Sequence, residues 1–165
     1  QGRRKRVALV RALVAAGYQV LGRGFFSVVV ESPAHPGIAF KVGAGLDTGY
    51  EYARWCRSRH TAKVKYAKHL PEVLGLVVRD GGYVVGTTVL HEHPESMDNW
   101  TGAIRHLLYG GCCETDVPTL NRAIRAIAFE FSDWQFDMHH GNWMLDGKGC
   151  IVITDPTSMR RGESF

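Results

Sequence analysis

The sequence lacks the features that would assign it to a disulfide, metal or membrane class. It has four cysteines, Cys56, Cys112, Cys113 and Cys150. No two of them form a C-x-x-C pair, so neither a zinc ribbon nor a thioredoxin-type motif is available, and a reducing cytoplasmic setting fits best. The most apolar early stretch, residues 7–16, is interrupted by an arginine and is too short to cross a bilayer. We therefore expect a soluble protein of the cytoplasm without a membrane partner.

Neither sign of charge dominates, and no repeat or low-complexity segment is present. The 20 basic and 16 acidic residues give a formal net charge of +4. Part of that excess is local, because several basic residues occur in the first eleven positions. They are Arg3, Arg4, Lys5, Arg6 and Arg11. Such a run is either a solvated terminus or a patch for an acidic partner, and we do not expect direct nucleic-acid binding from it.

Length and composition predict one globular domain. A chain of 165 residues falls within the usual size of about 100–200 residues per domain. Its 45% hydrophobic and 22% charged residues are ordinary globular values. Glycine is the exception, because 19 residues of this type exceed the average share of about 7%. The excess indicates positions that need a positive φ or a close approach of the backbone.

Turn signals and hydrophobic spacing divide the chain into a strand-rich first part and a helical second part. In the first part we expect a helix over 6–16, strands over 18–21, 26–31 and 38–42, a helix over 48–60, and a hairpin of strands over 73–78 and 83–90. In the second part we expect helices over 96–109 and 117–134, a loop over 137–142, and short strands over 143–145 and 151–154. The longer helix has an apolar stripe of Leu120, Ile124, Ile127, Phe131 and Trp134. The predicted fold class is α+β.

A glycine-containing turn joins the first two predicted strands. Its sequence is Gly22-Arg23-Gly24-Phe25-Phe26-Ser27-Val28-Val29. A hairpin with glycines at its tip exposes backbone N–H groups that can cover phosphate oxygens. No helix follows directly, as a dinucleotide-binding loop of the Rossmann type would require. A pair of glycines by itself is more often an ordinary turn.

Lys41 ends the apolar strand Ile38-Ala39-Phe40-Lys41. Lysine is rarely buried without a partner, so its side chain either reaches from the strand end to solvent or meets an anion. It follows Gly22 by 19 residues. That spacing places it to reach under the glycine turn towards the α- and β-phosphates of a nucleotide.

The most informative segment runs from Asp137-Met138-His139-His140-Gly141-Asn142 to Thr154-Asp155-Pro156. Asn142 follows Asp137 by five residues, and Asp155 follows thirteen residues later across a predicted hairpin. In this arrangement Asp137 can accept the proton of an attacking hydroxyl, while Asn142 and Asp155 offer hard oxygen ligands to Mg²⁺ on the phosphates. Taken with the glycine turn and Lys41 in this order, the segment predicts phosphoryl transfer from a nucleotide.

These three segments resemble the protein kinase fold, with a glycine-rich loop, I-A-F-K in place of V-A-I-K, and a D-x-x-x-x-N loop before a metal-binding aspartate. More narrowly, residues 17–159 resemble the early serine/threonine protein kinases of autographiviruses of the phage T7 type. The motifs that carry this resemblance are Gly22-x-Gly24-x-Phe26-Ser27, Lys41-Val42-Gly43, Cys56-Arg57, Phe136-Asp137-Met138-His139-x-Gly141-Asn142 and Ile153-Thr154-Asp155-Pro156.

The resemblance implies a minimal protein-kinase-like fold in a single domain over residues 1–165. Its N-terminal lobe would hold an antiparallel sheet over about 17–90, and a reduced helical C-terminal lobe would cover about 91–165. It implies ATP and Mg²⁺ as cofactors and host proteins, RNA polymerase and ribonucleases among them, as substrates in the host cytoplasm. Only ten residues follow Asp155, so substrate docking is expected on other surfaces, such as the helices over 96–134.

The resemblance also implies roles for individual residues. The implied nucleotide-binding residues are Gly22, Gly24, Ser27, Val29, Ala39, Lys41 and Glu51. The implied catalytic residues are Asp137, Lys41 and His139, and the implied metal ligands are Asn142 and Asp155. Val29 and Ala39 would pack on the adenine, and Asp137 would be the base. Glu51 is either the ion-pair partner of Lys41 or a surface glutamate.

His139 leaves the substrate class open. Protein kinases commonly have lysine two residues after the base, whereas kinases resembling aminoglycoside and choline phosphotransferases have histidine there. This imidazole either donates to the transferring phosphate or hydrogen-bonds the loop, and it motivates a small-molecule phosphotransferase as an alternative function. The short chain and its basic start motivate another alternative, a non-catalytic kinase-shaped inhibitor of a host protein. The other notable histidines, His91, His93 and His140, lack metal-site spacing to cysteines and are predicted to be surface or loop residues.

Three positions depart from the protein kinase pattern. Ser27 replaces the third glycine of the loop, Gln135-Phe136 precedes Asp137 in place of His-Arg, and Pro156-Thr157 replaces Phe-Gly. Without that arginine, we expect activity that does not depend on phosphorylation of an activation loop. The proline should stiffen the segment after Asp155.

Overall fold

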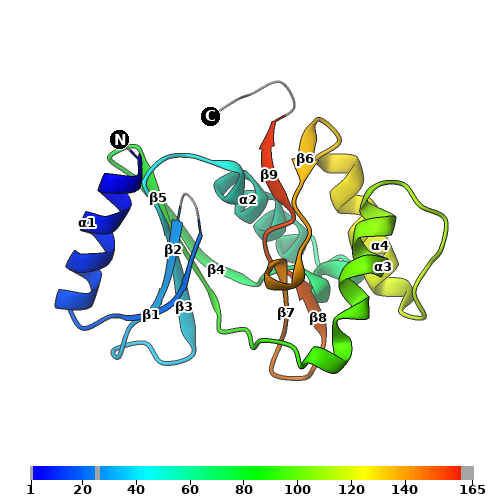
Figure 1. Cartoon of the computed structure of the whole chain (residues 1–165), viewed down its shortest axis with the longest axis horizontal. Coiled ribbons are helices and arrows are strands. Elements are labelled where there is room, and N and C mark those ends of the chain that lie inside the picture. The colour runs from blue at the N-terminus through cyan, green and yellow to red at the C-terminus, as the bar shows by residue number, and fades with distance from the viewer. Residues whose placement is uncertain (1, 25–26, 161–165) are drawn as a thin grey trace. The chain divides into compact units, whose positions relative to one another are not determined.

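The computed structural model describes residues 2–24 and 27–160, so Phe25 and Phe26 of the glycine turn lie outside the described residues (Figure 1). The chain divides into two compact units. The first comprises Gln1–Arg57 and Glu72–Val89, and the second comprises Ser58–Pro71 and Leu90–Phe165. Residues 58–71, expected in the N-terminal lobe, therefore fall in the second unit.

An antiparallel sheet of five strands forms the first unit, with the spatial order β1-β2-β3-β5-β4. Its strands are β1 (Gln19–Arg23), β2 (Ser27–Glu31), β3 (Ile38–Gly43), β4 (Val73–Arg79) and β5 (Gly82–Thr88). The helix α1 (Gly2–Ala15) precedes the sheet, and α2 (Thr48–Thr61) follows β3. The chain order of strand, strand, strand, helix, strand and strand is the predicted one. It confirms the α+β class with an N-terminal antiparallel sheet.

Different helices cover the two faces of this sheet. Val28 of β2 is fully buried and packs with Val10 of α1. On the other face, Tyr83 and Val85 of β5 pack with Ala53 of α2, because side chains alternate along a strand. Fully burying a valine side chain contributes roughly 1.5–3 kcal/mol. The sheet is therefore stabilised from both sides by apolar contacts.

Specific residues define the ends of the two helices. Gly17, at φ +86°, follows the last turn of α1 in the left-handed conformation that favours glycine at a helix end. The backbone N–H of Tyr50 donates to the Asp47 carboxylate over 3.1 Å, which caps the start of α2. The end of α1 and the start of α2 fall within one residue of the helices expected over 6–16 and 48–60.

Two helices and two small two-stranded sheets form most of the second unit. Its helices are α3 (Asn99–Leu108) and α4 (Pro118–Glu130), with the short 3₁₀ turns η1 (Lys65–His69), η2 (Glu95–Met97) and η3 (His140–Asn142). Its strands are β6 (Trp134–Phe136), β7 (Trp143–Leu145), β8 (Ile151–Ile153) and β9 (Thr157–Arg160), paired as β6 with β9 and β7 with β8. The core contains the fully or almost fully buried Ile104, Leu107, Leu120, Ile124, Ile127 and Trp143.

The helix predicted over 117–134 ends earlier, and this part of the expectation is wrong. α4 stops at Glu130, and Trp134 begins β6, where it pairs with Arg160. The N–H of Trp134 donates to the carbonyl of Phe131 over 2.9 Å, which turns the chain out of the helix. Phe131 and Trp134 still pack edge to face, with ring centroids 5.4 Å apart. The apolar spacing therefore continues beyond the end of α4 because Trp134, in β6, packs against Phe131.

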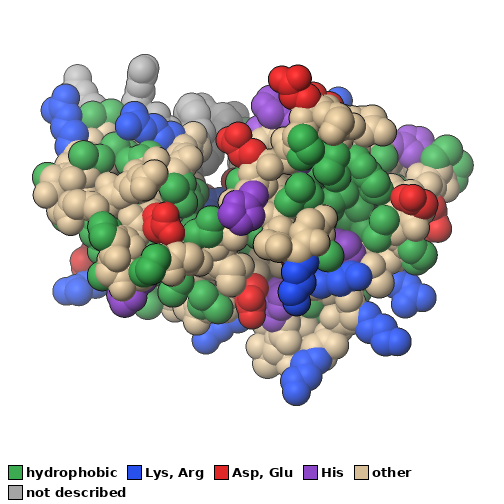
Figure 2. Space-filling view, turned by 90° about the horizontal axis from the view of Figure 1, so that it is seen from below, with side chains coloured by type: hydrophobic (Ala, Val, Ile, Leu, Met, Phe, Trp, Pro, Cys, Tyr) green, Lys and Arg blue, Asp and Glu red, His purple; other side chains and the backbone are tan. Residues whose placement is uncertain are grey.

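The described residues contain no helix with the length and apolar character needed to cross a membrane. On the face seen in Figure 2, Lys and Arg side chains are separated by acidic and uncharged side chains and do not form one continuous basic surface. This distribution agrees with the modest net charge of +4.

Candidate active site

Those predicted nucleotide-binding residues that lie on strands share one face of the sheet, whereas Glu51 lies on α2. A bulge in β1 between Val20 and Gly22 shifts the register, so that Gly22 pairs with Val29. Val29 in turn pairs with Lys41, and Lys41 pairs with Val85. Cross-strand partners point to the same side, so these residues form a row on the face that α2 covers.

The glycine turn is closed by its own backbone. The N–H of Gly24 donates to the carbonyl of Ser27 over 2.9 Å, and the Ser27 side chain is buried against Gly24. The Gly24 amide is therefore engaged within the hairpin. Contacts of this turn with phosphate oxygens stay a prediction.

The amine of Lys41 lies against the first turn of α2. A Cβ atom at Gly49 would lie 2.7 Å from the Lys41 Nζ and 3.0 Å from the Tyr83 hydroxyl oxygen. That hydroxyl donates to the Asp47 carboxylate over 2.9 Å. Glycine at position 49 therefore makes the space in which the lysine amine sits.

Glu51 lies in the first turn of α2, and its carboxylate faces Arg54. The Arg54 Nη1 lies 3.3 Å from the Glu51 Oε2, a partly exposed pair of the kind that contributes at most about 1 kcal/mol. An ion pair between Glu51 and Lys41 stays a prediction.

In the second unit, main-chain hydrogen bonds bring Asp137, Asn142 and Asp155 together. The N–H of Asp137 donates to the carbonyl of Pro156 over 2.9 Å. The Asn142 carbonyl accepts from Thr154 N–H at 2.9 Å and from Asp155 N–H at 3.4 Å. The Asn142 side-chain amide donates to the carbonyl of Asp137. Three residues that the sequence separates by five and thirteen positions thus meet at one place.

A backbone hydrogen bond fixes the tautomer of His139. The Gly141 N–H donates to the His139 Nδ1 over 3.1 Å, so Nδ1 is the acceptor and the proton of the neutral ring lies on Nε2. The His139 side chain is exposed. Its imidazole therefore bonds the loop through one nitrogen and presents an N–H donor with the other, so both predicted uses of this histidine are compatible.

The loop carbonyls have partners that sequence reasoning missed. The Tyr109 hydroxyl donates to the Phe136 carbonyl over 3.0 Å. The Arg105 Nε and Nη2 both donate to the Met138 carbonyl, over 3.2 and 2.7 Å. Such side-chain to main-chain bonds leave no periodic pattern in a sequence, so only the structure identifies them.

His93 is a further residue that holds the loop; it lies in the irregular segment between β5 and η2, as a predicted loop residue, but its side chain is not at the surface. Its side chain is 7% exposed, and its ring stacks on Trp143 with centroids 3.5 Å apart and an interplanar angle of 2°. Its Nε2 lies 2.9 Å from the His140 carbonyl, to which it donates. The Trp143 indole in turn donates to the Thr101 hydroxyl over 2.9 Å.

Burial changes the protonation of two groups away from these residues. Burial raises the pKa of the Cys56 thiol far above its usual range, against the smaller opposing effects of Tyr52 and Lys41. Burial also lowers the pKa of His69, against the opposing effect of its hydrogen bond to the Ile151 carbonyl. Both groups are therefore neutral at pH 7, and Cys56 is an unreactive core residue.

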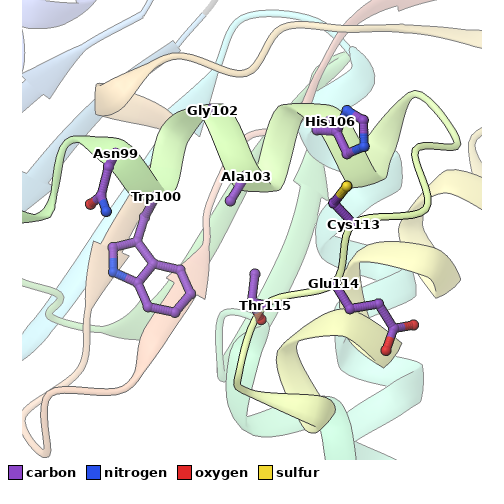
Figure 3. Close-up of a pocket in the computed structure, with 8 residues that line it drawn as sticks. All are labelled: Asn99, Trp100, Gly102, Ala103, His106, Cys113, Glu114 and Thr115. Atoms are coloured by element: carbon purple, nitrogen blue, oxygen red, sulfur yellow. The ribbon is translucent and has the colours of Figure 1, made fainter.

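A shallow pocket of about 390 Å³ lies in the second unit between α3 and the loop before α4. Figure 3 shows it lined by Asn99, Trp100, Gly102, Ala103, His106, Cys113, Glu114 and Thr115. None of the predicted site residues contributes to it. The pocket and the loop from Asp137 to Asn142 therefore share no residues.

The oxygen donors of the second unit fit a magnesium ion. Among the described residues, no group of three or more His, Cys, Asp or Glu side chains is arranged to hold a metal. Mg²⁺ bound to nucleotides needs only one or two carboxylates, with phosphates and water completing its shell. The Asp155 carboxylate and the Asn142 side-chain carbonyl, whose amide nitrogen is engaged with Asp137, are of this kind.

A protein-family model described as "Bacteriophage T7 protein kinase 0.7" matches residues 6–91, just over half of the chain. The chain belongs to the bacteriophage T7 protein kinase 0.7 family. Membership in this family confirms the resemblance recognised from the motifs. The matched range contains the glycine turn, Lys41 and Glu51, whereas the loop from Asp137 to Asn142 follows after its end.

The other comparisons are less specific for this member of the T7 protein kinase 0.7 family. No curated protein matches the chain. Among solved structures, the chain is similar to Rad53 residues 1–466 in complex with AMP-PNP, at 15% identity and a TM-score of 0.46. The similarity covers 83% of this chain and 36% of that chain. The chain thus spans about a third of the length of the solved structure it matches.

Proposed function

We propose that this protein is an ATP-dependent serine/threonine protein kinase of the phage type. It transfers the γ-phosphate of ATP to host proteins in the host cytoplasm. The observation that carries the proposal is the main-chain network that joins Asp137, Asn142 and Asp155. Family membership supports kinase chemistry. RNA polymerase and ribonucleases of the host are the substrates that the resemblance suggests.

Asp137 acts as the base. Its side chain is exposed, while its N–H and its carbonyl are both bonded within the loop network. A carboxylate on a fixed backbone can receive a hydroxyl from a protein substrate and accept its proton. The Nε2–H of His139, two residues later, donates to the phosphoryl oxygens and stabilises the charge that develops on them.

Asn142 and Asp155 would hold Mg²⁺ through their oxygen atoms. When bound, the ion would supply positive charge that neutralises the β- and γ-phosphates. Pro156, directly after Asp155, is buried and its carbonyl accepts from Asp137. The position of the Asp155 backbone is therefore tied to that of the base.

The first unit binds the nucleotide. Lys41 contacts the α- and β-phosphates, while Val29 and Ala39 pack on the adenine. These three side chains lie on the same face of the sheet, because Val29 pairs with Lys41 and Glu31 pairs with Ala39 in the β2–β3 register. The register of β2 and β3 thus supports the proposal that these three side chains contact the same nucleotide.

One observation favours a second function, a small-molecule phosphotransferase. His139 stands where aminoglycoside and choline phosphotransferases have histidine, and its Nε2–H is exposed for a phosphoryl group. Such an enzyme would share the Asp137, Asn142 and Asp155 chemistry. It would differ in taking its acceptor hydroxyl from a metabolite or an antibiotic.

Incubation with γ-labelled ATP, Mg²⁺ and host lysate tests the proposal. We expect labelled protein bands whose hydrolysate contains phosphoserine or phosphothreonine. Label in an antibiotic or metabolite, with unlabelled proteins, would support the second function. Absence of label in both fractions would reject catalysis and leave a kinase-shaped inhibitor. Purified host RNA polymerase and ribonucleases as substrates then test the suggested partners.

A further inference from the structure

The residue between the two proposed catalytic side chains is anchored twice. Met138 lies between Asp137 and His139, and its side chain is only 4% exposed. Its carbonyl accepts two hydrogen bonds from Arg105, at 3.2 and 2.7 Å. The neighbours on both sides are exposed. Anchoring at Met138 therefore sets the direction in which both catalytic side chains leave the loop.

Arg105 is well placed to supply this anchor. It lies in the last turn of α3, where its neighbours Ile104 and Leu107 are buried in the core of the unit. Its backbone is thus fixed by packing, while its guanidinium reaches the loop. A hydrogen bond from a charged donor is about twice as strong as a neutral one. No ion pair of Arg105 with an acidic side chain occurs in the described part of the chain. Its guanidinium instead donates to the Met138 carbonyl.

The carbonyls on either side reinforce this arrangement. Tyr109, one turn after Arg105, donates to the Phe136 carbonyl over 3.0 Å. His93 donates to the His140 carbonyl over 2.9 Å. The loop is therefore bonded from outside at alternate carbonyls, with Arg105 at the central one.

We propose that Arg105 is a positioning residue that orients Asp137 and His139 by fixing the Met138 carbonyl. The expected effect of Arg105 on catalysis rests on the proposed function. Its expected effect on the order of the loop does not depend on that function. Arg105 touches neither substrate nor phosphate in this role. Its loss should slow the chemical step more than it weakens nucleotide binding, because Lys41, Val29 and Ala39, proposed to contact the nucleotide directly, belong to the first unit.

The test compares Arg105→Leu, Arg105→Lys and a control, Arg122→Leu, which removes an exposed arginine from α4. Amide hydrogen exchange is measured on the full chain without nucleotide, at the Gly141 and Asn142 amides that bond His139. We expect Arg105→Leu to accelerate exchange there about 10- to 100-fold, the equivalent of losing a hydrogen bond to a charged group. Arg105→Lys should restore part of the protection, and Arg122→Leu should resemble the unmodified protein. Equal exchange in all variants would overturn the inference.

Kinetics with γ-labelled ATP separate positioning from a general loss of structure. Arg105→Leu should lower kcat about 10- to 100-fold, with a KM for ATP within a factor of about two. An unchanged kcat, or a rise in KM alone, would contradict the positioning role. If the unmodified protein transfers no phosphate, the proposed function fails, and the exchange experiment by itself decides the role of Arg105.

Tyr109→Phe keeps the proposal testable if Arg105→Leu does not fold. This change removes one hydroxyl and retains the ring that packs edge to face on Phe136 at 5.8 Å. Loss of a neutral hydrogen bond should accelerate exchange at Gly141 and Asn142 about 3- to 10-fold. No acceleration in a folded Tyr109→Phe protein would show that the outside bonds do not order the loop.

Discussion

The two units hold their candidate site residues by different physical means. In the first unit, strand register alone places Gly22, Val29 and Lys41 in one row. In the second unit, the loop from Asp137 to Asn142 has only a short 3₁₀ turn of its own. Besides its main-chain bonds to Thr154, Asp155 and Pro156, its carbonyls accept hydrogen bonds from side chains such as Arg105.

This difference predicts how each unit responds to mutation. A ladder of main-chain bonds between strands continues when one side chain changes, so the first unit should tolerate substitutions that leave its close approaches intact. A loop held by individual side chains loses geometry with each of them. Substitutions in the second unit should therefore disturb the catalytic geometry most. In the first unit, substitutions should lower folding stability most at Gly43, where the backbone lies against the Tyr83 ring.

The largest expected effect comes from the lysine of the first unit. Lys41→Met should lower phosphate transfer about 10²- to 10³-fold, because a charge on the transferring nucleotide loses its partner. Amide exchange in the Asp137 loop should not change. Steady-state rates with labelled ATP, compared with Lys148→Met in the exposed β7–β8 turn, measure the effect. Equal rates for the two variants would remove Lys41 from the site.

The next effect concerns stability and a close approach in the first unit. A Cβ at Gly43 would lie 2.1 Å from the Tyr83 ring, whereas a Cβ at Gly45 meets no atom within 4 Å. Gly43→Ala should lower the free energy of unfolding by about 1–3 kcal/mol, the usual cost of overpacking, and Gly45→Ala should not. Denaturant titration of both variants measures this difference. Similar stabilities would show that the ring moves aside at little cost.

A smaller, pH-dependent effect is expected in the second unit. The His69 Nδ1 donates to the Ile151 carbonyl at 2.7 Å, and its Nε2 accepts from the Thr119 hydroxyl at 2.9 Å. Because the pKa of His69 is lowered in the folded state, the unfolded chain binds more protons below its ordinary value of about 6.5. The free energy of unfolding should therefore fall as the pH drops below about 6.5. The loss should level off once the pH is below the lowered pKa of His69 in the folded protein.

Melting temperatures at pH 7.5 and 5.5 test the His69 effect. The unmodified protein should lose more stability between these values than His69→Gln, whereas the exposed His91→Gln should behave like the unmodified protein. The same loss in both variants would assign the pH dependence to other groups.

The smallest perturbation is chemical labelling of the four thiols. Cys112 and Cys113 are exposed, Cys150 is half-buried and Cys56 is fully buried. Two thiols should react rapidly with a disulfide reagent, one more slowly, and Cys56 only on unfolding, since burial raises its pKa and blocks access. Rapid reaction of Cys56 in the native protein would contradict the packing of α2 on its sheet.

Much of the fold and of the candidate site could be predicted from the sequence. Strong turn signals bound β1 to β5, and the spacing between Asp137, Asn142 and Asp155 indicated that they would meet. β9 was missed because Thr157–Arg160 has no alternating pattern and forms a strand only through its pairing with β6. The end of α4 was misplaced because Trp134 packs on Phe131 from outside the helix.

The anchors of the loop could not be predicted for a different reason. Arg105 lies on the exposed side of the amphipathic helix α3 and Tyr109 directly after its end, where exposed polar groups are expected in any case. Their partners are main-chain carbonyls, which every residue carries. His93 lies between Glu92 and Pro94, a polar context that suggests a surface loop, and only tertiary packing places its ring on Trp143.

The rate of γ-phosphate transfer by Asp137→Asn tests the central claim most directly. Asparagine keeps the size and the backbone bonds of this position but cannot accept the hydroxyl proton. Transfer to protein should fall at least 10²-fold, while the melting temperature and the loop exchange stay those of the unmodified protein. Transfer that continues undiminished in Asp137→Asn would contradict the assignment of the base and, with it, the proposed mechanism.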